Sequence, residues 1–339
     1  MKKQVNPHRH WLLFTLLRAA NSVMRSVLLL ATGWIAYSNL RIKHKVNLPE
    51  AIPASRKEFV SATAGKVSYY VDLQGKGKPL VLIHSINAAA SAYEMRPLFT
   101  AYQDKRPVYA LDLPGFGFSD RSSREYSPAF YAAVIAEFLE TQVKKAADVV
   151  ALSLSCEFAA QAALECPQQF HSLILISPSG FTRRTSSSSQ KAVRSGFSRR
   201  IYGLLSAPLW ARPLFDLIVT RPSIRYFLSR SFLGPVPTDL VDYSDATAHQ
   251  PGAEIAPLYF LSGLLFTRDA LTKIYDQVQV PALVIFDRDG FVTFDLVPDL
   301  VASKQNWQST RIVPSLGLPQ FEKLPETLEA LTDFWDKLK

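Results

Sequence analysis

Short apolar runs recur along this chain and alternate with longer segments that have the pattern of helices. Runs of five or six residues with this composition are typical of strands buried on both faces of a parallel sheet. Such strands are predicted at Pro79–His84, Pro107–Leu111, Asp148–Leu152, Ser172–Ser177, Ala282–Phe286 and Thr310–Pro314. Helices are predicted at 127–143, 154–165, 257–276 and 326–338, and a β-hairpin at 59–63 and 66–73. This order predicts an α/β fold, with a mostly parallel sheet and helices on both faces.

The alternation stops between residues 181 and 255, a basic, proline-rich stretch that contains the run Ser186–Ser189. We interpret this stretch as a helical cap inserted into a domain that spans residues 58–339, after a linker at 46–57. Within the cap, residues 201–233 interleave apolar residues with arginines. The cap is then either a solvated lid whose apolar side covers a pocket or a lid that rests on lipid. Both alternatives predict an apolar pocket.

Positive charge is concentrated in two parts of the chain, whose net charge is +9. Residues 1–45 hold eight Lys or Arg and no acid, and residues 181–235 hold ten with one acid, Asp216. These basic residues stand among leucine, tryptophan, phenylalanine and isoleucine. Such a mixture favours an anionic membrane surface over a nucleic acid as the partner.

The N-terminal segment, residues 1–45, is predicted to associate with membranes as a single anchor. Its apolar run Ser26–Leu40 has fifteen residues, whereas a bilayer needs about 20. Extension back to Ala19 includes Asn21 and Arg25. Four alternatives remain: a membrane-spanning signal anchor, an amphipathic helix in the interface, a signal peptide cleaved near residues 36–38, and a soluble helix packed on the body. The side of the membrane stays open.

One serine stands where a predicted strand meets a predicted helix. The strand Asp148–Leu152 ends, Ser153 follows, and the next helix starts immediately. Such a turn is strained and needs small residues two positions before and after the serine; Ala151 and Ser155 meet that requirement. The turn would present the Ser153 hydroxyl at the carboxyl edge of the sheet, beside a helix N-terminus. An ordinary serine at a strand end is the alternative.

Four further motifs accompany this serine, and together they resemble the α/β-hydrolase superfamily, specifically its capped members, over about residues 58–339. The nine-residue stretch Asp112–Asp120 (DLPGFGFSD) is the most specific of them. The others are Leu82–Ser85, which resembles the strand that leads into the oxyanion loop, Phe286–Asp289, which resembles the turn with the catalytic acid, and Gly317–Glu322, which resembles the segment with the catalytic base.

The resemblance implies a role for particular residues. Ser153 would be the nucleophile, and Asp289 the acid or the residue that orients a water molecule. The backbone amides of Ile86 and Leu154 would form the oxyanion hole. The resemblance implies no metal and no organic cofactor.

The catalytic base is missing from its expected place. Alignment on Pro319 and Glu322 puts Gly317 in the histidine position, and a shift by one residue puts Leu318 there. The last histidine in the chain is His249. A serine hydroxyl without an adjacent base is a poor nucleophile. His249 in the cap or His84 at a strand end could substitute, although a structural role is the alternative for both.

Two functions are compatible with these residues. The first is a membrane-associated serine hydrolase or acyl-transfer enzyme with an incomplete triad, which acts on an apolar ester-like substrate. The second is a non-catalytic protein of the same fold that binds a ligand or serves as a scaffold. The expected partners are a small apolar substrate or ligand and membrane lipid, bound through the N-terminal segment and the cap. Nucleic acid is not expected.

Overall fold

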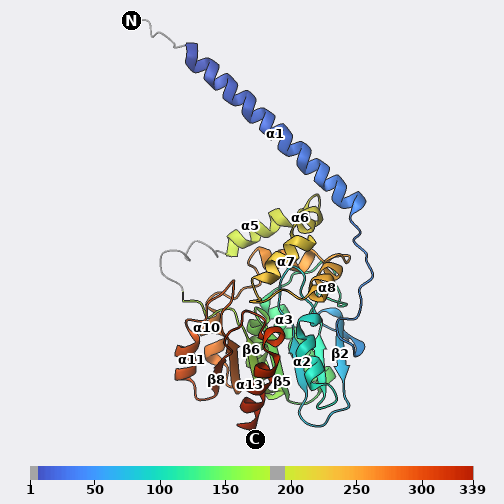
Figure 1. The fold of residues 1–339 in the computed structure, drawn as a ribbon, viewed down its shortest axis with the longest axis vertical. Coiled ribbons are helices and arrows are strands. Elements are labelled where there is room, and N and C mark those ends of the chain that lie inside the picture. The colour runs from blue at the N-terminus through green and yellow to red at the C-terminus, as the bar shows by residue number, and fades with distance from the viewer. Residues whose placement is uncertain (1–6, 184–194, 339) are drawn as a thin grey trace.

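An eight-stranded sheet forms the centre of the protein (Figure 1). The structure is a computed structural model and describes residues 7–183 and 195–338. The strands lie in the order β1-β2-β4-β3-β5-β6-β7-β8. β2 pairs antiparallel with β1 and β4, and the pairings from β4 to β8 are parallel. Their bounds are β1 Ser55–Ser61, β2 Gly65–Asp72, β3 Leu80–Ile83, β4 Val108–Leu111, β5 Ala147–Leu152, β6 Phe170–Ile176, β7 Ala282–Phe286 and β8 Trp307–Arg311.

Helices cover both faces of this sheet, which confirms the predicted α/β class. On one face α3 and α4 pack into a large apolar cluster through residues such as Tyr131 and Phe158. On the other face α2 and α13 pack through Phe99 and Phe334. The helices are α1 Pro7–Arg41, α2 Arg96–Tyr102, α3 Pro128–Phe138, α4 Ser155–Glu165, α5 Ser195–Leu205, α6 Ala211–Ile218, α7 Arg221–Ser229, α8 Thr238–Ala248, α9 Ile255–Leu261, α10 Ala270–Lys273, α11 Val297–Ser303, α12 Pro319–Glu322 and α13 Leu324–Asp336.

Three boundaries differ from the sequence-based prediction. The predicted helix 257–276 is wrong in extent: α9 ends at Leu261, because Gly263 takes a φ of +78° that stops the helix. The last strand lies at residues 307–311 rather than 310–314, with Trp307 buried against the sheet. The predicted linker 46–57 is partly core, since Ile52 is fully buried and β1 begins at Ser55.

The cap helices α5 to α8 lie between β6 and β7 in the chain and sit over one end of the sheet (Figure 1). Helices α6, α7 and α8, with the residues next to them, form a third apolar cluster. Its buried members are Phe215, Val219, Ile224, Val241, Ala248 and Ala253. The run Ser186–Ser189, which motivated part of the cap prediction, lies outside the described residues.

The N-terminal helix α1 extends away from the body, and its C-terminal end lies beside the cap (Figure 1). Several of its apolar side chains between residues 23 and 40 are open to solvent; Leu29 and Leu30, for example, are each 74% exposed. Among the helices of residues 7–183 and 195–338, none has both the length and the apolar content that crossing a bilayer requires.

Candidate active site

Ser153 occupies a strained turn between β5 and α4. Its φ is +56°, a left-handed conformation that costs a residue with a side chain about 1–3 kcal/mol. Its amide donates to the Ile176 carbonyl at 2.9 Å, and its own carbonyl accepts from the Cys156 amide at 3.2 Å. Ala151 and Ser155 are both fully buried, so larger side chains at these two positions would not fit. The chain thus holds a half-buried serine at the carboxyl edge of the sheet.

The two residues predicted to form the oxyanion hole, Ile86 and Leu154, come after the neighbouring parallel strands β3 and β5. Ile86 follows β3, Leu154 precedes α4, and both residues are 2% exposed. Within the described parts of the chain, neither amide donates a hydrogen bond to a protein acceptor. Leu154 stands at the N-terminus of α4, where an unused donor is suited to stabilise a developing oxyanion.

A buried glutamate orders the loop that contains Ile86. Glu94 accepts from the Ser85 amide at 2.8 Å and from the Asn87 side-chain amide at 2.9 Å. Asn87 also donates to the Ser85 hydroxyl at 3.0 Å. Burial raises the pKa of the Glu94 carboxyl. The sequence analysis missed Glu94, because a single glutamate ahead of a helix carries no signal of a loop contact.

Asp289 lies just after β7 and is turned toward the loop that follows β8. Its Oδ1 accepts from the amides of Phe291 and Val292 at 2.7 and 3.1 Å. Burial raises the pKa of this carboxyl. A Cβ atom added to Gly317 would lie 2.5 Å from Asp289 Oδ2, whereas Leu318 is buried in an apolar cluster. Gly317 therefore faces the carboxylate, and Leu318 does not.

The space that a base would need at Gly317 is narrowed by the cap. The Ser231 Cβ and Oγ each lie 3.3 Å from the position of a Cβ at residue 317. The adjoining Leu233 and Gly234 donate their amides to Glu322 Oε1, at 2.6 and 3.2 Å. The cap segment is thus fixed onto the loop that would carry the base. Ser231 was missed by sequence reasoning, since no motif connects it to Gly317.

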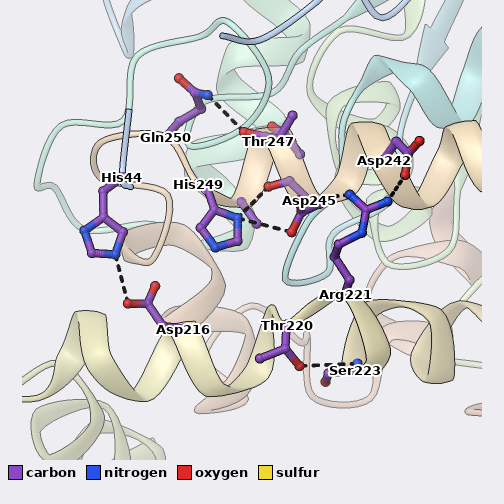
Figure 2. Close-up of polar contacts among 12 residues, drawn as sticks. His44, Asp216, Thr220, Arg221, Ser223, Asp242, Asp245, Thr247, His249 and Gln250 are labelled. Carbon is purple, nitrogen blue, oxygen red and sulfur yellow. Dashed lines mark hydrogen bonds and ion pairs between the residues drawn. The ribbon is translucent and has the colours of Figure 1, made fainter. Parts of the chain in front are cut away.

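His84 and His249, the two possible substitutes for the base, form hydrogen bonds with other groups. The ring of His84 is fully buried: Nδ1 donates to the Ser85 carbonyl at 2.6 Å, and Nε2 accepts from the Leu113 amide at 2.9 Å. His249 directly follows α8, and its Nδ1 lies 2.7 Å from the Asp245 carbonyl oxygen (Figure 2). No hydrogen bond joins either ring to Ser153 in the part of the chain that the structure describes.

His84 should make the stability of the fold depend on pH. Burial lowers its pKa from 6.5 to about 4, so between these values the unfolded chain binds more protons than the folded one. Stability is therefore lost as the pH falls from about 6.5 to about 4, by roughly 3 kcal/mol. Urea unfolding measures the difference in the free energy of unfolding between wild type and His84→Gln. This difference should be smaller at pH 4 than at pH 6.5 by about that amount. A difference that stays constant would contradict this assignment.

Comparison with known proteins places these features in a family. The profile of the Alpha/beta hydrolase family matches residues 80–330. The uncharacterized hydrolase YugF of Bacillus subtilis is 32% identical over 119 residues, 34% of this chain and 43% of that protein. The dihydrolipoyllysine-residue acetyltransferase component of the acetoin cleaving system of Cupriavidus necator is 32% identical over 133 residues, 39% of this chain and 34% of that protein.

A solved structure extends the likeness over nearly the whole chain. It is that of a membrane phospholipase A described as a bacterial virulence factor, with a TM-score of 0.65 and 19% identity. The match covers 98% of this chain and 99% of the other, and at this identity it shows the fold alone. The curated relatives are matched over less than half of their own length. The family profile, the sheet order and the turn at Ser153 agree, and the chain belongs to the alpha/beta hydrolase family.

Proposed function

We propose that this protein is a membrane-associated serine hydrolase or acyl-transfer enzyme, with Ser153 as its nucleophile and an apolar ester as its substrate. The observation that carries the proposal is the left-handed backbone of Ser153. Strain of this kind persists where the surroundings enforce it, and it clusters at functional sites. The unused amides of Ile86 and Leu154 supply the place where the oxyanion would bind.

The chemistry expected of this site is slow. Attack by Ser153 releases a proton, and the leaving group must gain one. Asp289 would orient a water molecule for this transfer, because Gly317 brings no imidazole. Removal of the base from a catalytic triad leaves a residual rate from the oxyanion hole and binding. Activated esters are therefore the appropriate assay substrates, and a fluorophosphonate that labels Ser153 is the direct test.

A non-catalytic binding protein is the second candidate, and one observation favours it. Ser231 and Asp289 both lie close to the space that a side chain at residue 317 would enter. A site closed in this way could keep an apolar pocket without the chemistry. Absence of fluorophosphonate labelling at Ser153, together with retained binding of an apolar ester analogue, would favour this candidate over the enzyme.

Association with a bilayer is proposed through α1, lying in the interface. The exposed apolar residues of α1 accompany Arg18 and Arg25, and residues 1–45 carry no acid. The cap adds exposed apolar side chains, among them Phe197, Leu204, Leu209, Leu217, Tyr226 and Phe227. An anionic surface complements both the charge and the apolar area. The structurally similar membrane phospholipase A makes a lipid-like ester a reasonable substrate class.

The double variant Leu29→Glu/Leu30→Glu should weaken binding to anionic vesicles by at least about tenfold, since burial of each leucine contributes roughly 1.5–3 kcal/mol. Co-sedimentation of the full chain with vesicles measures this effect. The matched control is Val60→Glu, which changes a valine that is 85% exposed on β1 of the body. The control should bind as wild type does. Equal binding by the α1 variant and wild type would contradict the proposal.

A further inference from the structure

The end of α1 and the residues after it are attached to the cap helix α6 by buried polar contacts. Ser38 Oγ donates to Asp216 Oδ2 at 2.6 Å. His44 Nε2 lies 2.9 Å from the same oxygen, as Figure 2 shows. The Trp34 indole donates to the Pro213 carbonyl at 2.7 Å. Ser38 and Asp216 are at most 1% exposed. We call Trp34, Ser38, His44, Pro213 and Asp216 the joint.

The joint is tied into the rest of the cap through Arg212. Its Nε lies 3.0 Å from Asp216 Oδ1, and its Nη1 lies 3.1 Å from Glu254 Oε2. A buried carboxylate is stable only when its oxygens are hydrogen-bonded and its charge is paired. Part of that requirement is met by residues that precede β1, so the N-terminal segment belongs to the packing of α6 and is more than a tether.

The same helix also belongs to an apolar cluster that the loop after β3 packs against. α6 contributes Phe215 to the apolar cluster of the cap, Val219 follows the helix in the same cluster, and Ala88 and Ala89 pack against this cluster. The Ala89 amide donates to Asn87 Oδ1 at 2.7 Å. These residues belong to the loop that contains Ile86, so α6 stands between the N-terminal helix and one donor of the oxyanion hole.

We infer that α6 transmits the binding of α1 to an anionic bilayer to the loop of residues 85–91, with Asp216 as the positioning residue. The inference rests on the proposed membrane association. α1 has 35 residues and is held at one end by the joint. When a bilayer fixes the orientation of α1, the joint therefore shifts α6. A shift of α6 changes how the cap cluster packs on Ala88 and Ala89, and with it the order of the Ile86 loop. The occupant of the α1 surface is a lipid bilayer.

Hydrogen exchange of the full chain tests this coupling without any need for catalysis. Vesicles that contain phosphatidylglycerol should slow exchange in α1 and also change it in residues 85–91, by roughly tenfold, the effect of one ordinary hydrogen bond. In Ser38→Ala/His44→Ala the vesicles should still bind and still protect α1. The response of residues 85–91 should be lost, because Asp216 then keeps Arg212 but no partner from α1.

Two further variants separate the joint from a general loss of stability. Ser38→Thr/His44→Gln keeps a donor at each position and should restore the response of residues 85–91. Asn39→Ala is the matched control, since the Asn39 side chain is exposed and donates to the Ile35 carbonyl of its own helix. It should respond as wild type does. Exchange in β5 serves as the internal reference for global unfolding.

The outcomes are distinct. An unchanged response of residues 85–91 in Ser38→Ala/His44→Ala would overturn the inference, as would a wild-type protein whose α1 is protected while these residues do not respond. Failure of the full chain to bind vesicles would overturn both the membrane association and the coupling. Failure of a fluorophosphonate to label Ser153 would contradict the proposed enzyme alone, since exchange does not depend on the chemistry.

Discussion

Gly317→His should raise the hydrolysis of activated esters by at least about tenfold, and general base catalysis typically contributes 10²–10⁴-fold when the base is well placed. The reason lies in the position of Gly317 over Asp289. An imidazole at this position would be oriented by the Asp289 carboxylate. We expect its other side to accept the Ser153 proton, as in a complete triad. Initial rates with a short activated ester measure the gain.

The surroundings of Gly317 determine how large this gain can be. Its φ does not lie in the left-handed region, so the backbone accepts a side chain. The new Cβ would lie 2.5 Å from Asp289 Oδ2, which is too close. The carboxylate must therefore turn Oδ2 away while Oδ1 keeps its hydrogen bonds to the Phe291 and Val292 amides. Ser231 is the second obstacle. We therefore expect Gly317→His/Ser231→Gly to exceed Gly317→His, and Ser231→Gly alone to leave the rate low.

Leu318→His is the control for this experiment. Leu318 is 6% exposed within an apolar cluster, so a histidine there would enter the core and not the site. It should destabilise the protein without a gain in rate. High wild-type activity that survives both His84→Ala and His249→Ala would contradict our account of the missing base. Equal, low rates in wild type, Gly317→His and Gly317→His/Ser231→Gly would favour the non-catalytic candidate.

Local rules made much of the fold and half of the site predictable. The strands were recognisable because burial on both faces requires continuous apolar runs. The loop after β4 was recognisable because Gly115 and Gly117 both have positive φ, which favours glycine. The turn at Ser153 follows a similar rule, since small neighbours make its strained backbone feasible. Each of these signals lies within a few consecutive residues.

The contacts that modify the site have no such local signal. Ser231 reaches Gly317 because the cap folds back, and Glu94 reaches Ser85 across the loop that it orders. The same holds for the partners of Asp216, where Ser38 and His44 are far from it in sequence. In the sequence, Asp216 is the one acid among ten basic residues of the cap region 181–235. Tertiary packing buries Asp216 and pairs it with Ser38, His44 and Arg212, and these contacts make it the centre of the joint.

The boundaries that differed also have physical explanations. The helix predicted at 257–276 continued through Gly263, where one left-handed residue was enough to end α9. The linker at 46–57 was inferred from prolines and mixed charge, yet Ala51 donates its amide to the Tyr70 hydroxyl at 2.8 Å and Ile52 is fully buried. Composition describes the average of a segment, whereas single buried residues fix its path.

Ser153→Ala should abolish fluorophosphonate labelling of the full chain and any hydrolysis of activated esters, because the reacting hydroxyl is removed. The variant keeps the backbone strain, so its stability should stay close to that of wild type. Intact-protein mass spectrometry after exposure to the probe measures the labelling. Persistent labelling in Ser153→Ala would place the nucleophile elsewhere and contradict the proposed function.

Ser153→Gly separates the strain from the chemistry. Glycine adopts a φ of +56° without steric cost, while it loses more conformational freedom on folding than serine. Relief of strain of about 1–3 kcal/mol against an entropic cost of about 0.5–1 kcal/mol predicts a net stabilisation of roughly 1 kcal/mol. Lys144→Gly is the matched control, because Lys144 has a φ of +59° at the end of a helical turn, away from the site.

Both glycine variants should unfold at higher urea concentrations than wild type, but Ser153→Gly alone should lose labelling. A gain in stability for Lys144→Gly without one for Ser153→Gly would mean that the serine hydroxyl contributes contacts which offset the strain. The turn would then be held by structural interactions, and the argument that strain at Ser153 reflects catalysis would fail. A gain at both positions, with labelling lost only at residue 153, is the result expected of a strained nucleophile.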